Sequence, residues 1–186
     1  MRGVRAASGL LAAAAVLAGC SDVGTSPIDS GIPDASTSVA ARSLPPPGVH
    51  WKGLRSKCPQ LTSGAARQLG AAGDGTPTDR WATSSIVTNA DCRWGSTDGR
   101  GTAVTARINI WVRQEAADAQ WQTLRTGQAD RIEAGDEGFV TDEGSAVVVR
   151  TRSGNAVAVV RLDGVADASD KAGEIADDVL DDLVPR

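Results

Sequence analysis

Residues 104–113 have the sequence VTARINIWVR, and this stretch decides the fold. Apolar side chains occupy its even-numbered positions, whereas Thr, Arg, Asn, Trp and Arg occupy the odd-numbered ones. Successive side chains of a strand point to opposite faces of the sheet, so this alternation predicts a half-buried strand of an antiparallel sheet. Asp98-Gly99 supplies a turn before the strand.

The segments on either side predict further strands and three helices. The last helix is the best defined, because apolar residues recur at helical spacing from Ala172 to Leu183 and Ser169 or Asp170 can cap it. The expected order is α-β-β-β-α-β-β-β-α, an α+β fold with an antiparallel sheet of about six strands and the helices on one face. The other expected elements are helices at 61–69 and 114–126, and strands at 81–88, 91–96, 137–142, 145–152 and 155–162.

The N-terminus predicts export and lipidation. Arg2 and Arg5 precede a run of 13 uncharged residues, which is too short to span a bilayer about 30 Å thick but is typical of a secretory signal. Leu17-Ala18-Gly19-Cys20 follows and resembles the lipobox of bacterial lipoproteins. That resemblance implies cleavage after residue 19 and palmitate-type acylation of Cys20, and two or three acyl chains anchor a protein stably. We therefore expect a chain anchored in the cell membrane on its extracellular or cell-wall side.

Residues 20–50 are predicted to be the lipidated cysteine and a disordered tether. Sixteen of residues 21–50 are Ser, Gly, Pro or Thr, and so few apolar groups cannot offset the entropy of ordering. Residues 51–186 are predicted to form one domain, which contains all five tryptophans. Once residues 1–19 are removed, 17 basic and 23 acidic side chains remain, and this acidity argues against nucleic-acid binding.

Two cysteines remain in the domain. Cys58 and Cys92 would lie in an oxidising compartment, where a pair of cysteines most simply forms a disulfide. A reactive thiol would need a neighbouring base, and no histidine follows His50. Trp94 is expected to pack over the disulfide and Trp121 to hold the second helix against the sheet.

These motifs together resemble the exported lipoproteins of unknown function that are common in actinobacteria. The similar residues, beyond the lipobox and tether, are Lys57-Cys58-Pro59-Gln60-Leu61 and Asp91-Cys92-Arg93-Trp94, and the similarity covers about residues 56–183. In that family the two cysteine motifs are bridged. The expected element order is also similar to the PsbP-like α+β fold, which some mycobacterial cell-envelope lipoproteins share. Gly64 and Arg67 depart from the more apolar helix usual there. The resemblance implies a location and a fold but no reaction.

The sequence contains few candidate catalytic or metal-binding residues. Without a histidine in the domain there is no Ser-His-Asp or Cys-His arrangement, so we expect no enzyme, no metal and no cofactor. A carboxylate cluster in the last helix could in principle hold a hard cation, but its spacing favours the solvated face of an amphipathic helix. The cluster consists of Glu174, Asp177, Asp178, Asp181 and Asp182.

A set of arginines around a tryptophan is the strongest candidate for a binding surface. If their strand faces coincide, they would lie on the side of the sheet without helices and could bind an acidic glycan, a lipid head group or an envelope protein. The alternative is a solvent-exposed sheet face on which the arginines only keep the protein soluble. The residues are Arg107, Trp111, Arg113, Arg150, Arg152 and Arg161. We therefore expect a lipoprotein that binds a cell-envelope ligand or protein, or alternatively an accessory or sensor subunit that acts only by protein contact.

Overall fold

The computed structural model describes residues 50–95, 102–125, 127, 129–165 and 168–186. Of these, 46% lie in strands and 23% in helices, and the main sheet is antiparallel with eight strands. The predicted six-stranded sheet with its α-β-β-β-α order is therefore wrong. The predicted signal peptide, Cys20 and the tether up to residue 49 lie outside the described residues.

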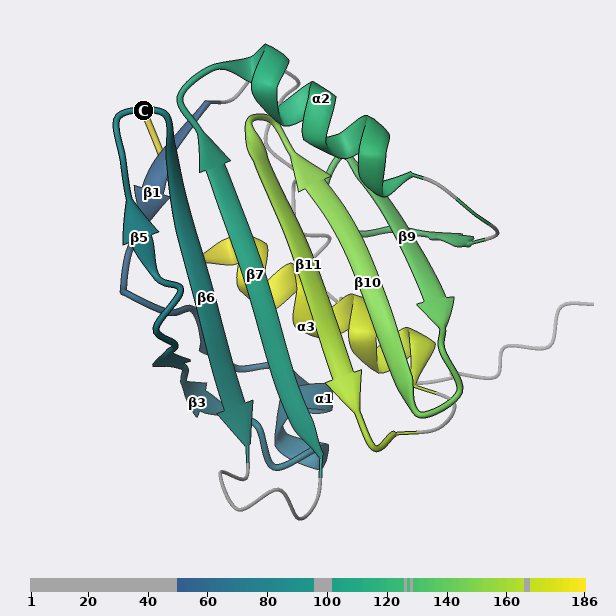
Figure 1. The fold of residues 1–186 in the computed structure, drawn as a ribbon. Helices are drawn as coiled ribbons and strands as arrows, with labels where there is room; N and C mark the ends of the chain where they lie inside the picture. The colour runs from purple at the N-terminus through teal and green to yellow at the C-terminus, as the bar shows by residue number, and fades with distance from the viewer. Residues whose placement is uncertain (1–49, 96–101, 126, 128, 166–167) are drawn as a thin grey trace, which may run out of the picture. The chain divides into compact units, whose positions relative to one another are not determined.

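Four long strands form the middle of the sheet (Figure 1). They are β6 (Val87–Gly95), β7 (Ala103–Trp111), β11 (Ala156–Asp163) and β10 (Ala146–Ser153), paired in this spatial order. Every neighbouring pair is antiparallel and in continuous register. The strand predicted from the alternation at 104–113 is confirmed as β7, although it ends two residues earlier, at Trp111.

Shorter strands complete both edges of the sheet. β9 (Glu137–Asp142) lies beside β10 and pairs with β8 (Asp130–Ile132). On the other edge, β4 (Thr76–Pro77) and β5 (Ala82–Thr83) both pair with β6. The predicted strands at 81–88 and 91–96 are thus wrong in their bounds. β6 runs from the last two residues of the first through most of the second, and β5 is a separate short strand within the first.

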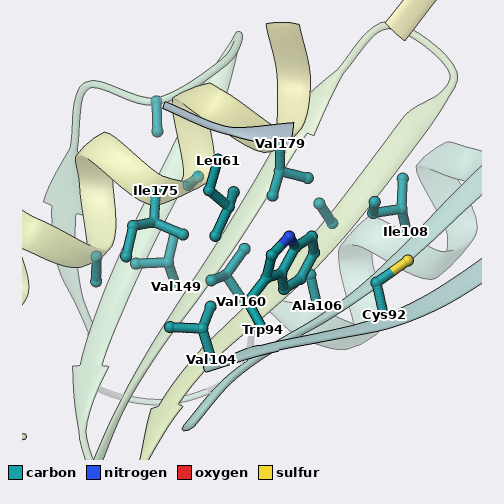
Figure 2. Packing of buried hydrophobic residues seen from close by; sticks show 14 of the residues in the cluster. Leu61, Cys92, Trp94, Val104, Ala106, Ile108, Val149, Val160, Ile175 and Val179 are labelled. Atoms are coloured by element: carbon teal, nitrogen blue, oxygen red, sulfur yellow. The ribbon is translucent and has the colours of Figure 1, made fainter. Parts of the chain in front are cut away.

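Even-numbered residues of β6, β7 and β11 and odd-numbered residues of β10 build the main core. Val104, Ala106 and Ile108 of β7 face α3 (Ser169–Asp181), whose Ile175 and Val179 are fully buried. Figure 2 shows these side chains meeting beneath the helix. Each fully buried aliphatic side chain of this kind contributes about 1.5–3 kcal/mol.

The helices cover both faces of the sheet, so the expectation of one helical face is also wrong. α3 and the short α1 (Gly64–Gln68) lie on the face of the main core. α2 (Gln114–Leu124) lies on the opposite face, as Figure 1 shows. The bounds of α2 and α3 agree closely with the predicted helices, so the error concerns the side of the sheet that α2 covers.

Two small pairings outside the main sheet carry no periodic pattern and were not predicted. One pairing joins the start of the domain to its last residues, and the other joins the residues before and after α1. β1 (Trp51–Leu54) pairs with β12 (Leu183–Pro185), and β2 (Gln60–Leu61) pairs with β3 (Gly73–Asp74).

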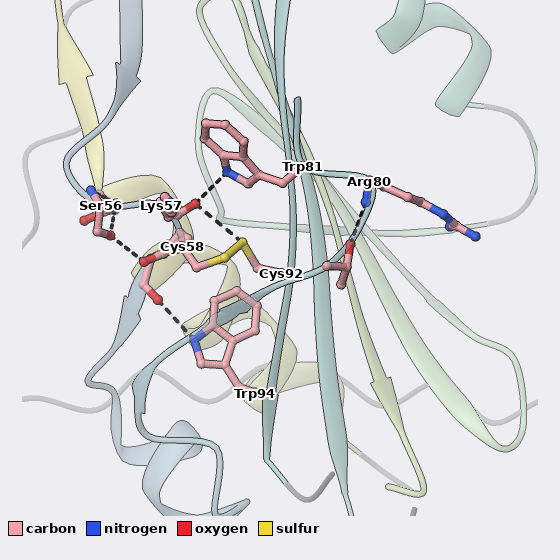
Figure 3. The surroundings of a disulfide bond; sticks show 10 residues. Ser56, Lys57, Cys58, Arg80, Trp81, Cys92 and Trp94 are labelled. Atoms are coloured by element: carbon pink, nitrogen blue, oxygen red, sulfur yellow. Dashed lines mark hydrogen bonds between the residues drawn. A yellow bond between two sulfur atoms is a disulfide. The ribbon is translucent and has the colours of Figure 1, made fainter. Parts of the chain in front are cut away.

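The predicted disulfide between Cys58 and Cys92 is confirmed. Both cysteines are buried, and the bond fixes the segment before α1 to the middle of β6. Indole groups flank it (Figure 3): the Nε1 of Trp94 donates to the carbonyl of Pro59 at 3.0 Å, and the Nε1 of Trp81 donates to the carbonyl of Lys57 at 2.9 Å. The disulfide and the two indoles therefore hold the same three residues.

Carboxylates of α3 also hold the start of α1. Glu174 and Asp181 are exposed, as the predicted solvated face requires, but Asp178 is buried and departs from that prediction. Asp178 is only 2% exposed, and its Oδ2 accepts hydrogen bonds from the backbone N–H groups of Thr62 at 3.1 Å and Ser63 at 2.8 Å. Glu174 accepts from the N–H of Ala65 at 3.0 Å. These carboxylates satisfy N–H groups at the start of α1 that have no partner within so short a helix.

Replacing Asp178 with Ala should destabilise the domain by about 2–3 kcal/mol, because two backbone N–H groups lose their hydrogen-bond acceptor. Asp178→Asn keeps one acceptor oxygen and should lose less than half as much. The free energy of unfolding from urea denaturation measures both. Asp130→Ala, an exposed carboxylate of β8, is the control. Equal stability of Asp178→Ala and the control would contradict the structural role of Asp178.

Candidate functional site

Five of the six predicted site residues, four arginines and Trp111, lie on one face of the sheet, the face that carries α2. Arg107 is opposite Val159, which is in turn opposite Arg150, and side chains of directly paired residues share a face. By the same register Arg161 neighbours Thr105, and Arg152 neighbours Val157. The arginine-bearing faces of the strands therefore coincide. This side of the sheet was expected to carry no helix, but α2 packs on it.

Helix α2 covers one end of this face with a small second core. Trp121 is fully buried against Val157, and its ring stacks on Phe139 of β9 with centroids 5.8 Å apart. The Nε1 of Trp121 also donates to Glu137. The prediction that Trp121 anchors the second helix on the sheet agrees with this packing, and the helix thereby leaves the other end of the face uncovered.

Trp111 and Arg113 do not contribute to an exposed surface of arginine and indole. Trp111 is half-buried, packs beside the α2 core and donates from Nε1 to Oε1 of Gln120 at 2.7 Å. Arg113 lies beyond the end of β7, at the N-cap of α2, and is not on a strand. The cation–π surface expected around Trp111 is therefore not assembled, because α2 occupies the indole.

Each of the four arginines on this face has a carboxylate partner. Arg107 contacts Asp91 of β6 at 3.1 Å, and Arg152 contacts Asp118 of α2 at 3.0 Å. Glu143, in the turn between β9 and β10, contacts Arg161 at 2.6 Å and Arg150 at 3.8 Å. Arg161 also contacts Asp163 at 2.8 Å. Its hydrogen bond to Glu143, and to a lesser extent the one to Asp163, raises the pKa of the guanidinium.

We call the uncovered end the charged sheet face and define it by Asp91, Arg107, Glu143, Arg161 and Asp163. Its arginines are exposed although they are paired: the side chains of Arg107 and Arg161 are 51% and 40% accessible, whereas that of Asp91 is 14% accessible. Exposed pairs of this kind add at most about 1 kcal/mol each to stability. The surface is therefore a mosaic of both charge signs rather than a basic patch.

The acidic members of this mosaic were not recognised from the sequence. Asp163 follows Arg161 by two residues and so had to share its face, a signal that alternation does provide. Asp91 carries the same signal once β6 is known to run through it. Asp118 and Glu143 come from α2 and from a turn, and no local pattern shows that they reach the arginines.

Other sites in the described part of the chain are modest. A depression of about 180 Å³ lies beside β4, below the roughly 300–1,000 Å³ of typical ligand pockets. Within the described ranges, no three His, Cys, Asp or Glu side chains are grouped so that they could hold a metal ion. None of the described helices has the length and apolar character needed to cross a membrane. The residues around the depression are Asp74, Thr76, Pro77, Thr78, Arg93, Trp94 and Gly95.

Comparison with known proteins adds no function to this geometry. No protein-family model, curated protein or solved structure matches the chain. Any function assigned to it therefore rests on motifs of its own sequence and on the contacts, burial and charges of its residues.

Because its arginines are paired, the domain should bind a polyanion such as heparin only weakly. Replacing Asp91 with Asn and Glu143 with Gln together removes partners of Arg107, Arg150 and Arg161, so this variant should elute from heparin at higher salt. Asp130→Asn with Glu133→Gln makes the same change in net charge at exposed residues outside the charged sheet face and should shift elution less. Strong retention of the unmodified domain, or equal shifts for the two double variants, would show that the pairing does not limit anion binding.

Proposed function

We propose that the mature protein is a lipid-anchored, extracytoplasmic lipoprotein that binds another protein of the cell envelope. The lipobox ending at Cys20 and the uncharged run before it support the anchor and the export. The buried disulfide supports an oxidising compartment, since such bonds persist outside the cytoplasm. The resemblance to actinobacterial exported lipoproteins points to the same location.

The observation that carries the binding role is the exposure of the charged sheet face. α2 covers only one end of this sheet face. The uncovered end presents guanidinium and carboxylate groups side by side, and such a surface suits a partner that also carries both charge signs. Proteins meet that condition, and complementary charges would fix register and speed encounter. An acidic glycan would instead compete with Asp91 and Glu143 for the same arginines.

The role we propose is non-enzymatic. The carboxylates of the charged sheet face all contact arginines, so each of them is already engaged in an ion pair. An accessory or sensor subunit, which acts solely through protein contact, is a special case of the same proposal and would use the same face.

The anchor is tested by Cys20→Ser in the full-length chain expressed in its own envelope. Without the thiol no acyl chain can be attached, so the protein should move from the membrane fraction to the medium. Fractionation followed by immunodetection measures the distribution. Cys20→Ser protein that stays in the membrane fraction would contradict a lipid anchor at this residue.

The binding face is tested by a photo-crosslinking residue in place of Thr105, which lies between Arg93 and Arg161 in the sheet. In intact cells this position should give a discrete adduct with an envelope protein. Arg107→Glu with Arg161→Glu should lower the adduct yield about tenfold, the effect of losing about 1.4 kcal/mol of affinity.

The same crosslinker at Glu133, an exposed residue next to β8, is the matched control and should give no such adduct. An adduct that persists after both arginines are reversed, or that forms equally from Glu133, would overturn the assignment of the charged sheet face.

A further inference from the structure

Two aliphatic side chains are exposed side by side at one end of the sheet. Ile86 is 62% exposed and Val112 is 44% exposed, and in the described part of the chain they are the large hydrophobic residues that stand out in this way. The N–H of Val112 donates to the carbonyl of Ile86 at 2.9 Å, so the two residues are held together. Single exposed aliphatic residues need no explanation, but an adjacent pair at a defined place does.

That place is where the chain enters the domain from its predicted tether. The N–H of Arg186 donates to the carbonyl of His50 at 2.8 Å, and the Nη2 of Arg186 donates to the carbonyl of Val112 at 3.4 Å. A continuous path of hydrogen bonds therefore leads from His50 to Ile86. Figure 1 agrees, because the C-terminus lies beside the turn between β5 and β6.

The anchor would keep this end near the bilayer. Thirty residues separate Cys20 from the domain, and a flexible chain of that length spans roughly 30 Å root-mean-square. Tethering over such a distance gives an effective concentration on the order of millimolar, so even a weak contact with the membrane is populated.

We propose that the corner formed by Ile86 and Val112 rests in the interface of the bilayer that holds the acyl chains. This inference depends on the lipid anchor of the proposed function. The exposed cations Lys52, Arg113 and Arg186 belong to the same end of the domain and suit the phosphate level, where long basic side chains keep their charge in water. The pair inserts as the aliphatic residues of interfacial segments do.

A bilayer fits this corner better than a partner protein does. Stable protein interfaces bury about 800 Å² on each side and centre on aromatic or arginine anchors in pockets. Two aliphatic side chains, one just before β6 and one just after β7, supply neither. The placement also leaves the charged sheet face available. β6 starts at this corner and runs away from it, so the face would stand to the side of the membrane rather than against it.

The test is depth-dependent quenching of an added tryptophan in the lipidated, mature full-length chain. Ile86→Trp protein is reconstituted into vesicles of phosphatidylcholine and phosphatidylglycerol with or without brominated acyl chains, and the emission of the unmodified protein is subtracted. Brominated lipid should lower the added emission by about half, as for a ring at the headgroup boundary. Val112→Trp is a second reporter should the first perturb the turn.

Ser145→Trp is the control, because Ser145 precedes β10 at the opposite end of the sheet, where Ala146 pairs with Asp163. Equal quenching at positions 86, 112 and 145, or none at 86 and 112, would overturn the membrane contact. Flotation of the same samples separates the two proposals. Protein that fails to float with the vesicles contradicts the anchor, whereas floating protein without quenching contradicts only the contact of Ile86 and Val112.

Discussion

The apolar face that the long strands present to α3 is the constraint on which the rest of the structure depends. Val104, Ala106 and Ile108 can be buried only if β7 keeps its register, and a slip of one residue would turn them to the other face. Closing this core requires α3, and α3 in turn holds the start of the domain through Asp178 and Glu174. The disulfide and the indole of Trp94 hold the residues just before this segment from the side of β6, so the start and the last helix of the domain stabilise one core.

The opposite face follows from the same alternation, because the residues between the buried ones must point away from α3. Its side chains are mostly polar, and the short amphipathic α2 can cover only the end where Val157, Phe139 and Trp121 meet. The remaining arginines cannot be left beside one another without partners, and carboxylates from β6, β11 and the turn after β9 contact them. What results is a stable and exposed surface of alternating charge, which is why we propose a protein partner rather than a polyanion.

Long elements could be predicted from the sequence, whereas pairings that depend on distant residues could not. The strand around Ile108 and the helix around Val179 repeat a period often enough to be recognised. β4 and β5 have two residues each and exist only because β6 offers a free edge. The amphipathic pattern of α2 indicates one apolar side but not which face of the sheet receives it, and this is why the helices were wrongly expected on one face. For the candidate site, alternation showed which arginines of one strand share a face, but the register that joins the faces of different strands came only from the structure. Trp111 is occupied by α2, and the partners Asp118 and Glu143 come from outside the strands.

The central functional claim is that a protein covers the charged sheet face in the envelope, and the accessibility of its arginines tests this most directly. Phenylglyoxal modification of Arg107 and Arg161 can be compared by mass spectrometry between the purified protein and intact cells, with the exposed Arg80 as the internal reference. We expect both arginines to react in the purified protein and to be protected in cells, while Arg80 reacts equally in both. Equal reactivity of Arg107 and Arg161 in the two settings would contradict the claim.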